Sequence, residues 1–291
     1  MCQGHPEDTL FSVHDKVVAI TGAAGIIYSC IARGLAERGA KVALLDLMAD
    51  KAREVADEIV ADGGEAIAVQ CNVLEEASVQ AALTAIIAKW GTVDALINGA
   101  GGNRAGATVQ RDGKFTDLNL EELDKVFALN YKGTFLPTQV FCKYFATPPR
   151  EKGIIINTSS MSAILPLTNV PGYSNAKAAV TNFTRWLAVQ TRVDYPQAKI
   201  RVNEIAPGFL DTTQNHRLLF EEDDKTLTLR GQSVIDHTPL GRFGDPKELL
   251  GPVILLLSDA GSFLHGATIP IDGGFSICCG VGPLDEKNPK A

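Results

Sequence analysis

Short apolar runs alternate with longer amphipathic stretches along most of the 291-residue chain. Each short run is rich in aliphatic and β-branched residues with few polar interruptions, as in a strand that is buried on both faces. Each longer stretch repeats its apolar positions every three or four residues, as a helix with one buried face does. The pattern predicts strands at residues 16–21, 41–45, 65–70, 95–97, 153–157, 199–205 and 267–271. It predicts helices at residues 29–38, 50–62, 77–90, 120–145, 173–192 and 246–258.

Strands that alternate with helices favour a parallel sheet, because parallel neighbours need a long crossover between them. Right-handed crossovers then give an α/β doubly wound, Rossmann-type sheet with helices on both faces. No Pro- and Ser-rich linker and no internal repeat divides the sequence, so we expect a single domain at residues 1–291. Residues 209–245 form the one long irregular stretch, where we expect a substrate loop or lid. We expect a short C-terminal tail at residues 276–291.

Composition limits the class of protein further. The net charge is -7, from 27 basic and 34 acidic residues, and no basic cluster suggests a nucleic-acid partner. No apolar stretch approaches the length of about 18 residues that a membrane span needs. The first residues lack the apolar core of a signal peptide, so we expect a cytoplasmic protein with no membrane partner. The cysteines and histidines show no metal-ligand spacing, so no metal site is expected.

A glycine-containing turn with Gly22 and Gly25 follows the first predicted strand and leads into a predicted helix. In such a turn, backbone N–H groups and the helix dipole can bind a pyrophosphate. Asp46 ends the second predicted strand, where a carboxylate can accept hydrogen bonds from the ribose hydroxyls of NAD. The same charge would repel the 2′-phosphate of NADP, and no Arg or Lys lies in the turn. These residues predict NAD as the cofactor, while a purely structural turn and a solvated acid remain the alternatives.

Tyr173 and Lys177 are spaced four residues apart, which places both side chains on one face of a predicted helix. A free phenol has a pKa of about 10 and is a poor base at neutral pH. A neighbouring ammonium would favour the phenolate, so we expect Lys177 to lower the pKa of Tyr173. A Tyr and Lys pair at this spacing often occurs by chance, so its weight depends on the motifs around it.

With these motifs, the protein resembles the short-chain dehydrogenase/reductase family over nearly its whole length. The shared motifs are Thr21-Gly22, Asn72-Val73, Asn98 to Gly101, Asn130, Ser160, Tyr173 with Lys177, Pro207-Gly208 and Thr212. The resemblance implies that Tyr173 exchanges a proton with the substrate oxygen and that Ser160 hydrogen-bonds that oxygen. It implies that Lys177 holds the nicotinamide ribose and assists Tyr173, and that Asn130 fixes a water in the proton relay. The implied cofactor-binding residues are Thr21, Gly22, Gly25, Ile27, Asp46, Asn72, Val73, Asn98, Ala100, Gly101, Tyr173, Lys177, Pro207, Gly208 and Thr212.

Four positions depart from the family pattern. Ile26 and Tyr28 replace the second and third glycines of the usual turn, so their side chains narrow the approach to the pyrophosphate. Asn72 stands where an Asp usually contacts adenine, and Gly99 replaces the second Asn of the usual Asn-Asn-Ala-Gly. None of the four belongs to the proton-transfer set that the resemblance implies.

Within this family, a narrower resemblance is to the D-mannonate oxidoreductases, also called fructuronate reductases. It rests on residues 97–103, 134–141, 159–166, 182–188, 206–209, 237–244 and 271–275. It implies that NAD oxidises the hydroxyl of a sugar acid, or that NADH reduces a keto-uronate. Arg104 and Arg217 are the candidate groups for gripping the substrate carboxylate.

The resemblance also bears on assembly, since members of this family are usually dimers or tetramers. We therefore expect a homodimer or homotetramer in which residues 182–189 and 269–275 are buried against partner subunits. A related gluconate or polyol dehydrogenase remains the alternative enzyme. A non-catalytic dinucleotide-binding protein is a further alternative, which the presence of all four catalytic residues disfavours.

Overall fold

The computed structural model describes residues 9–110, 112–148, 152–212, 216 and 218–278 of the protein. In this part, seven strands form one sheet in the order β3-β2-β1-β4-β5-β6-β7, and every neighbouring pair is parallel. The strands are β1 Val17–Thr21, β2 Lys41–Asp46, β3 Glu65–Gln70, β4 Ala95–Asn98, β5 Lys152–Thr158, β6 Lys199–Pro207 and β7 Thr268–Ile271. The doubly wound Rossmann-type fold predicted from the sequence is confirmed.

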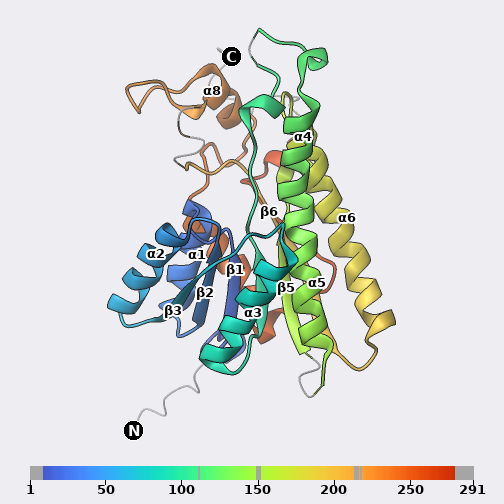
Figure 1. Cartoon of the computed structure of the whole chain (residues 1–291). Coiled ribbons are helices and arrows are strands. Elements are labelled where there is room, and N and C mark those ends of the chain that lie inside the picture. The colour runs from blue at the N-terminus through green and yellow to red at the C-terminus, as the bar shows by residue number, and fades with distance from the viewer. Residues whose placement is uncertain (1–8, 111, 149–151, 213–215, 217, 279–291) are drawn as a thin grey trace.

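Helices cover both faces of this sheet (Figure 1). They are α1 Ile26–Ala36, α2 Ala49–Ala61, α3 Glu76–Trp90, α4 Leu120–Phe127, α5 Gly133–Ala146, α6 Pro171–Asp194, α8 Leu229–Asp236 and α9 Leu250–Leu257. Alternate residues of β1 point to opposite faces, so Val18 and Ile20 pack with α1, α2 and α9. Val17 and Ala19 pack with α3, α5 and α6. One apolar core therefore lies on each side of the sheet.

Two predicted helices are interrupted in the structure. The stretch predicted at residues 120–145 divides into α4, a π-helical turn at Ala128–Lys132, and α5. The stretch predicted at residues 246–258 begins with a 3-10 turn, Pro246–Leu249, before α9. Helix α6 begins at Pro171, two residues before the predicted start, because proline suits the first turn of a helix.

The segment expected to be a loop, residues 209–245, contains the helix α8, which the sequence analysis missed. Thr228 caps its N-terminus by accepting a hydrogen bond from Gly231 N–H at 3.0 Å. In Figure 1, α8 lies beyond the carboxyl ends of the strands, on the same side as the start of α6. Of the tail expected at residues 276–291, only residues 276–278 lie within the described part.

Within the described residues, no helix combines the length and the apolar character needed to cross a membrane. The same part of the protein brings together no group of three His, Cys, Asp or Glu side chains suited to hold a metal ion.

Candidate active site

The candidate site lies at the carboxyl edge of the sheet, where β1, β4, β5 and β6 end. The loops after these strands carry most of the residues that the sequence analysis singled out. In open parallel sheets, ligands bind at this edge, where the strand order reverses. The reversal falls here between β1 and β4, which are neighbours in the sheet although two strands separate them in the sequence.

The glycine turn after β1 depends on close backbone approaches. Gly22 has a φ of 66°, and a Cβ atom on it would lie 2.7 Å from Ala100 Cα. Gly25 is the N-cap of α1, and among the described residues no side chain caps the N–H groups of this helix. Gly25 and Ile26 are exposed, so these N–H groups can donate hydrogen bonds to a phosphate. The turn therefore fits the pyrophosphate of a dinucleotide even though Ile26 and Tyr28 replace two glycines.

Asp46 is buried at the end of β2, beside the glycine turn. Its carboxylate accepts hydrogen bonds from Ala24 N–H and from Met48 N–H, each at 2.9 Å. A carboxylate can accept about four hydrogen bonds, so capacity remains for the hydroxyls of a ribose. Asp46 thus also fastens the glycine turn to the second strand, a role that the sequence analysis did not foresee.

Two of the expected cofactor-binding side chains face the protein. Thr21 is fully buried, and its Oγ1 accepts hydrogen bonds from Gly99 N–H at 3.1 Å and Ala100 N–H at 3.2 Å. Asn98 is also buried, and its amide donates to Thr138 Oγ1 at 2.8 Å. These side chains hold the ends of β1 and β4 in place, which leaves the backbone of this edge to face a ligand.

Asn72 and Val73 follow β3 in a tight turn. The Asn72 amide donates to Glu75 Oε1 at 2.8 Å, and its carbonyl accepts from Leu74 N–H at 3.1 Å. Val73 is buried, with its Cγ2 2.9 Å from where a Cβ on Gly133 would lie. The two hydrogen bonds of Asn72 use one of the two N–H donors and one of the two lone pairs of its amide, so the amide keeps capacity for a contact with adenine.

Ser160, Tyr173 and Lys177 meet beside the end of β5. Tyr173 and Lys177 lie in the first two turns of α6, with Lys177 Nζ 5.6 Å from the centroid of the Tyr173 ring. Lys177 is buried and donates from Nζ to the carbonyl of Thr158 at 2.9 Å. Ser160 forms a hydrogen bond with the Tyr173 side chain and accepts one from Ser162 N–H at 3.1 Å. The structure thus brings these three expected catalytic side chains together.

The electrostatics of this group differ from the sequence-based expectation. Burial raises the pKa of Tyr173 above its ordinary value, and the hydrogen bond with Ser160 opposes that rise. Burial lowers the pKa of Lys177 to about 8, against a smaller opposing effect of Glu204. The pKa of Tyr173 in the ligand-free site is therefore raised and not lowered as expected, because removal of water dominates. Tyr173 is a neutral phenol there, as a proton donor must be.

Asn130 lies in the π-helical turn between α4 and α5 and is fully buried. Its side chain accepts a hydrogen bond from Gly102 N–H at 3.1 Å and donates to Gly102 O at 2.7 Å. A Cβ atom on Gly101 would lie 2.7 Å from Asn130 Oδ1 and 3.2 Å from Lys177 Nζ. The missing side chain at Gly101 therefore lets Asn130 and Lys177 come close together, and π-helical turns often mark functional sites.

Pro207, Gly208 and Thr212 follow from the end of β6 along the same edge. A Cβ atom on Gly208 would lie 2.6 Å from Asp272 Cα, and Gly208 N–H donates to Ile271 O at 2.9 Å. Thr212 is buried. Ile27 packs its side chain against the core on the α1 face, which leaves its backbone to the turn.

The structure describes only one of the two arginines expected to bind the substrate carboxylate. Arg104 is exposed, and its Nε donates to Glu122 Oε2 at 2.6 Å. Arg217 lies outside the described residues. A third arginine, Arg230 of α8, was not singled out by the sequence analysis. Its Nε is buried and has no hydrogen-bond partner in the described part of the protein, and its guanidinium lies 6.0 Å from the ring centroid of Phe209.

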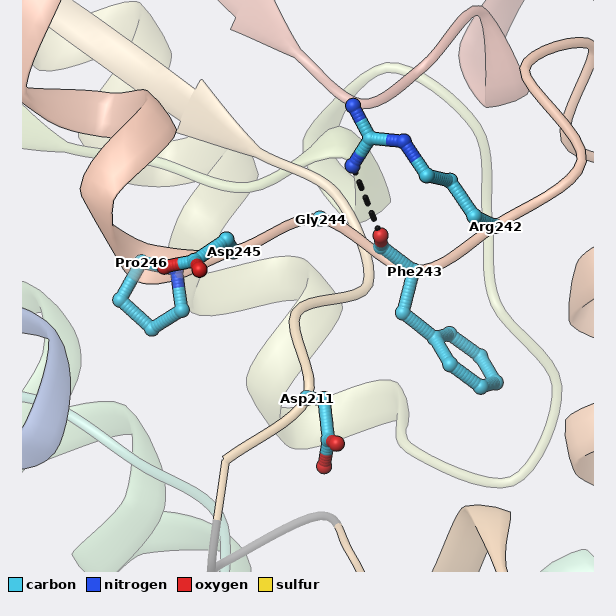
Figure 2. A pocket seen from close by; sticks show the side chains of 6 residues that line it. All are labelled: Asp211, Arg242, Phe243, Gly244, Asp245 and Pro246. Atoms are coloured by element: carbon cyan, nitrogen blue, oxygen red, sulfur yellow. Dashed lines mark hydrogen bonds between the residues drawn. The ribbon is translucent and has the colours of Figure 1, made fainter. Parts of the chain in front are cut away.

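A pocket of about 360 Å³ opens between the segment after β6 and the start of the Pro246–Leu249 turn. Figure 2 shows its lining residues, Asp211 and residues 242–246. Arg242 donates there to Phe243 O at 3.0 Å and to both carboxylate oxygens of Glu248, so its charge is already paired. None of the expected catalytic residues lines this pocket.

Comparison with known proteins agrees with this geometry. Residues 16–223 match the family of short-chain dehydrogenases. The protein belongs to the short-chain dehydrogenase/reductase family. It is therefore an oxidoreductase that uses a nicotinamide dinucleotide, and a small molecule is its substrate.

Three similar proteins cover nearly all of the sequence. The uncharacterized oxidoreductase UxuB of Bacillus subtilis is 44% identical, over 91% of this chain and 96% of its own length. The 5-keto-D-gluconate 5-reductase of Escherichia coli K12 is 32% identical, over 92% of this chain and 98% of its own. A crystal structure with bound NAD, of a candidate D-mannonate oxidoreductase from Haemophilus influenzae, has a TM-score of 0.85 and 43% identity. It covers 93% of this chain and 99% of its own.

Proposed function

We propose that this protein is an NAD(H)-dependent oxidoreductase for a sugar acid of the D-mannonate and D-fructuronate type. The observation that carries the reaction is the meeting of Ser160, Tyr173 and Lys177 beside the glycine turn. The substrate class is supported by similarity, over nearly the whole sequence, to a candidate D-mannonate oxidoreductase. NAD rather than NADP is supported by the buried carboxylate of Asp46 and by the NAD bound in that relative.

In the proposed mechanism, bound NADH supplies a hydride to the carbonyl carbon, and NAD accepts it in the reverse reaction. Ser160 donates a hydrogen bond to the substrate oxygen and orients it. Tyr173, neutral because burial raises its pKa, donates its proton to that oxygen as the C–H bond forms. The carbonyl thus becomes a CH–OH group. A proton then returns to Tyr173 from solvent through Lys177 and a water that Asn130 holds.

Arg230 is the best-supported candidate for gripping the carboxylate. A buried N–H donor of a cationic group without a partner is costly, and an anionic ligand would satisfy it. Arg230 lies over Phe209, which directly follows Pro207 and Gly208, two of the residues expected to bind the cofactor. Arg104 and Arg217 remain candidates, although Glu122 already pairs with Arg104.

The decisive experiment follows NADH absorbance with D-fructuronate, 5-keto-D-gluconate and the uncharged ketose D-fructose. We expect D-fructuronate to have the highest kcat/KM. Arg230→Met should raise the KM for the keto acid about ten- to a hundredfold, the effect of losing a charged hydrogen bond, and leave the KM for NADH unchanged. Arg53→Met, at an exposed position of α2, is the matched control and should change neither constant.

The alternative enzyme, a gluconate or polyol dehydrogenase, is favoured by the similarity to the 5-keto-D-gluconate 5-reductase. Higher kcat/KM for 5-keto-D-gluconate would assign that activity instead. Equal activity toward D-fructose and the keto acids would show that the protein has no binding site for the substrate carboxylate.

We also propose that the protein works as a homodimer or homotetramer. Trp186, Val189 and Val193 are more than half exposed on the outer face of α6. Strand β7 is at the edge of the sheet in a single copy of the protein. Large exposed apolar side chains in this number are typical of a surface that a partner covers.

A further inference from the structure

Tyr28 and Gly99 are two separate departures from the family pattern in the sequence, and the structure places them in contact. A Cβ atom on Gly99 would lie 2.5 Å from each of Tyr28 Cδ2 and Cε2. Real side chains do not approach this closely, so the Tyr28 ring fills the space that a side chain at position 99 would need. The Tyr28 ring occupies the volume that a side chain at position 99 would occupy, so the two departures compensate for each other in packing.

The Tyr28 hydroxyl extends this contact across the sheet. Tyr28 is buried in the first turn of α1, and its hydroxyl is hydrogen-bonded to Thr158 Oγ1 at the end of β5. The Thr158 hydroxyl donates its single hydrogen to the carbonyl of Asn98 at 2.6 Å. Tyr28 must therefore be the donor to Thr158. Burial raises the pKa of Tyr28 far above its ordinary value, so this proton stays in place.

Thr158 joins Tyr28 to the catalytic group. Its side chain receives the Tyr28 hydroxyl, and its backbone carbonyl accepts the hydrogen bond of Lys177 Nζ at 2.9 Å. We propose that Tyr28, accommodated by Gly99, is a positioning residue that fixes Thr158 and thereby the ammonium group of Lys177. This proposal rests on the role of Lys177 proposed above, but not on the identity of the substrate.

A purely space-filling role for Tyr28 would give a different result from positioning. If the ring only filled space, Tyr28→Phe would be neutral, because the ring is retained. If the hydroxyl positions Lys177, the same variant should lower the rate of the chemical step, since small displacements of reacting groups are expensive. Tyr28→Phe therefore separates the two roles with the loss of one atom.

We expect Tyr28→Phe to lower kcat about two- to tenfold, the range set by one neutral hydrogen bond. The dissociation constant of NADH, measured by fluorescence titration, should stay within twofold of the wild-type value. Tyr195→Phe is the matched control, because Tyr195 caps the opposite end of α6 from Tyr173. Assays should use whichever substrate of the panel is turned over fastest, so that failure of the sugar-acid assignment leaves this test intact.

A double-mutant cycle with Thr158→Val tests the connection itself. If Tyr28 acts through the Thr158 hydroxyl, the double variant should have the same kcat as Thr158→Val alone. Unchanged kcat in Tyr28→Phe, or independent losses in the two single variants, would overturn the positioning role.

The match between Tyr28 and Gly99 is tested by the thermal stability of the ligand-free protein, which needs no activity. Tyr28→Gly and Gly99→Asn should each lower the Tm, the first by leaving a cavity and the second by a clash. The double variant should recover part of the summed loss; recovery is partial because Thr21 O also lies 2.6 Å from the added Cβ. Fully additive losses would overturn the match, and if Gly99→Asn fails to fold, folding of the double variant supports it.

Discussion

Replacing Lys177 with methionine is expected to stabilise the ligand-free protein while abolishing its activity. Burial lowers the pKa of Lys177 from an ordinary 10.5 to about 8. Each pKa unit corresponds to about 1.4 kcal/mol, so the charged form costs the fold about 3 kcal/mol below pH 8. Methionine keeps most of the length of the side chain without the charge. The lost hydrogen bond to Thr158 O and the lost attraction to Glu204 offset part of the gain, which leaves about 1–2 kcal/mol.

The sign of the pH dependence makes this prediction specific. Between about pH 8 and pH 10.5 the unfolded protein binds a proton at Lys177 that the folded protein does not, so the wild type gains stability as the pH rises. The advantage of Lys177→Met should therefore be largest at pH 7 and should shrink toward pH 10. Urea unfolding of both proteins at these two pH values measures it, with Lys51→Met on the exposed face of α2 as the control. A variant less stable than the wild type at pH 7, or a difference independent of pH, would refute the reasoning.

Three further outcomes are expected. Tyr173→Phe should lower kcat by ~10²–10⁴-fold, the usual contribution of a general acid, with an unchanged NADH dissociation constant; retention of half the activity would remove Tyr173 from the mechanism. Asp46→Ala should weaken NAD binding and reduce the preference for NAD over NADP, because a hydrogen-bond acceptor and a repulsive charge are lost together. A wild type that already prefers NADP in the same titrations would contradict this. Light scattering at micromolar concentration should give the mass of a dimer or tetramer, and Val189→Asp should reduce it; a wild-type monomer would contradict the proposed assembly.

The strands could be predicted from the sequence almost to the residue. In β1 and β2 most positions are apolar, because helices cover both faces of a parallel sheet and the signal does not depend on register. The break at Ala128–Lys132 could not be predicted in the same way. Periodicity shows which face of a helix is apolar, but it does not show which carbonyl each backbone N–H bonds. In this turn the Asn130 side chain donates to Val126 O at 2.8 Å, a contact that the apolar pattern does not report.

Helix α8 escaped prediction for a related reason. Its sequence, LRGQSVID, buries only Gly231 and Val234, so its apolar stripe is too short to show a helical period. The sequence signal that could have indicated α8 is its N-cap residue, since Thr228 directly precedes the helix in a stretch without proline. Arg230 was missed with it, because an arginine in an expected loop looks like an ordinary surface residue.

Ser160, Tyr173 and Lys177 could be named from the sequence because the spacing of Tyr173 and Lys177 agreed with the surrounding motifs of the family that the protein resembles. The pKa shifts of Tyr173 and Lys177 could not be predicted, since they depend on how much water the rest of the fold removes. Burial is a property of the whole fold, and it reversed the expected direction for Tyr173. The contact between Tyr28 and Gly99 is likewise invisible to local pattern, since 71 positions separate the two residues in the sequence.

The proposed function requires one site to repel one anionic group and to bind another, and the sheet order allows this. Asp46 ends β2, and the segment that carries Arg230 follows β6, with β1, β4 and β5 between them. Four strand spacings, roughly 19 Å, separate the ends of β2 and β6 along the edge. Arg230 lies against Phe209, which is two residues beyond the end of β6. Over that distance a negative charge at one end and a positive charge at the other interact weakly through water and salt. The proposed functions of the two residues are therefore compatible: Asp46 would disfavour a phosphate on the adenine ribose at β2, and Arg230 would favour a carboxylate beside Phe209, without either charge cancelling the other.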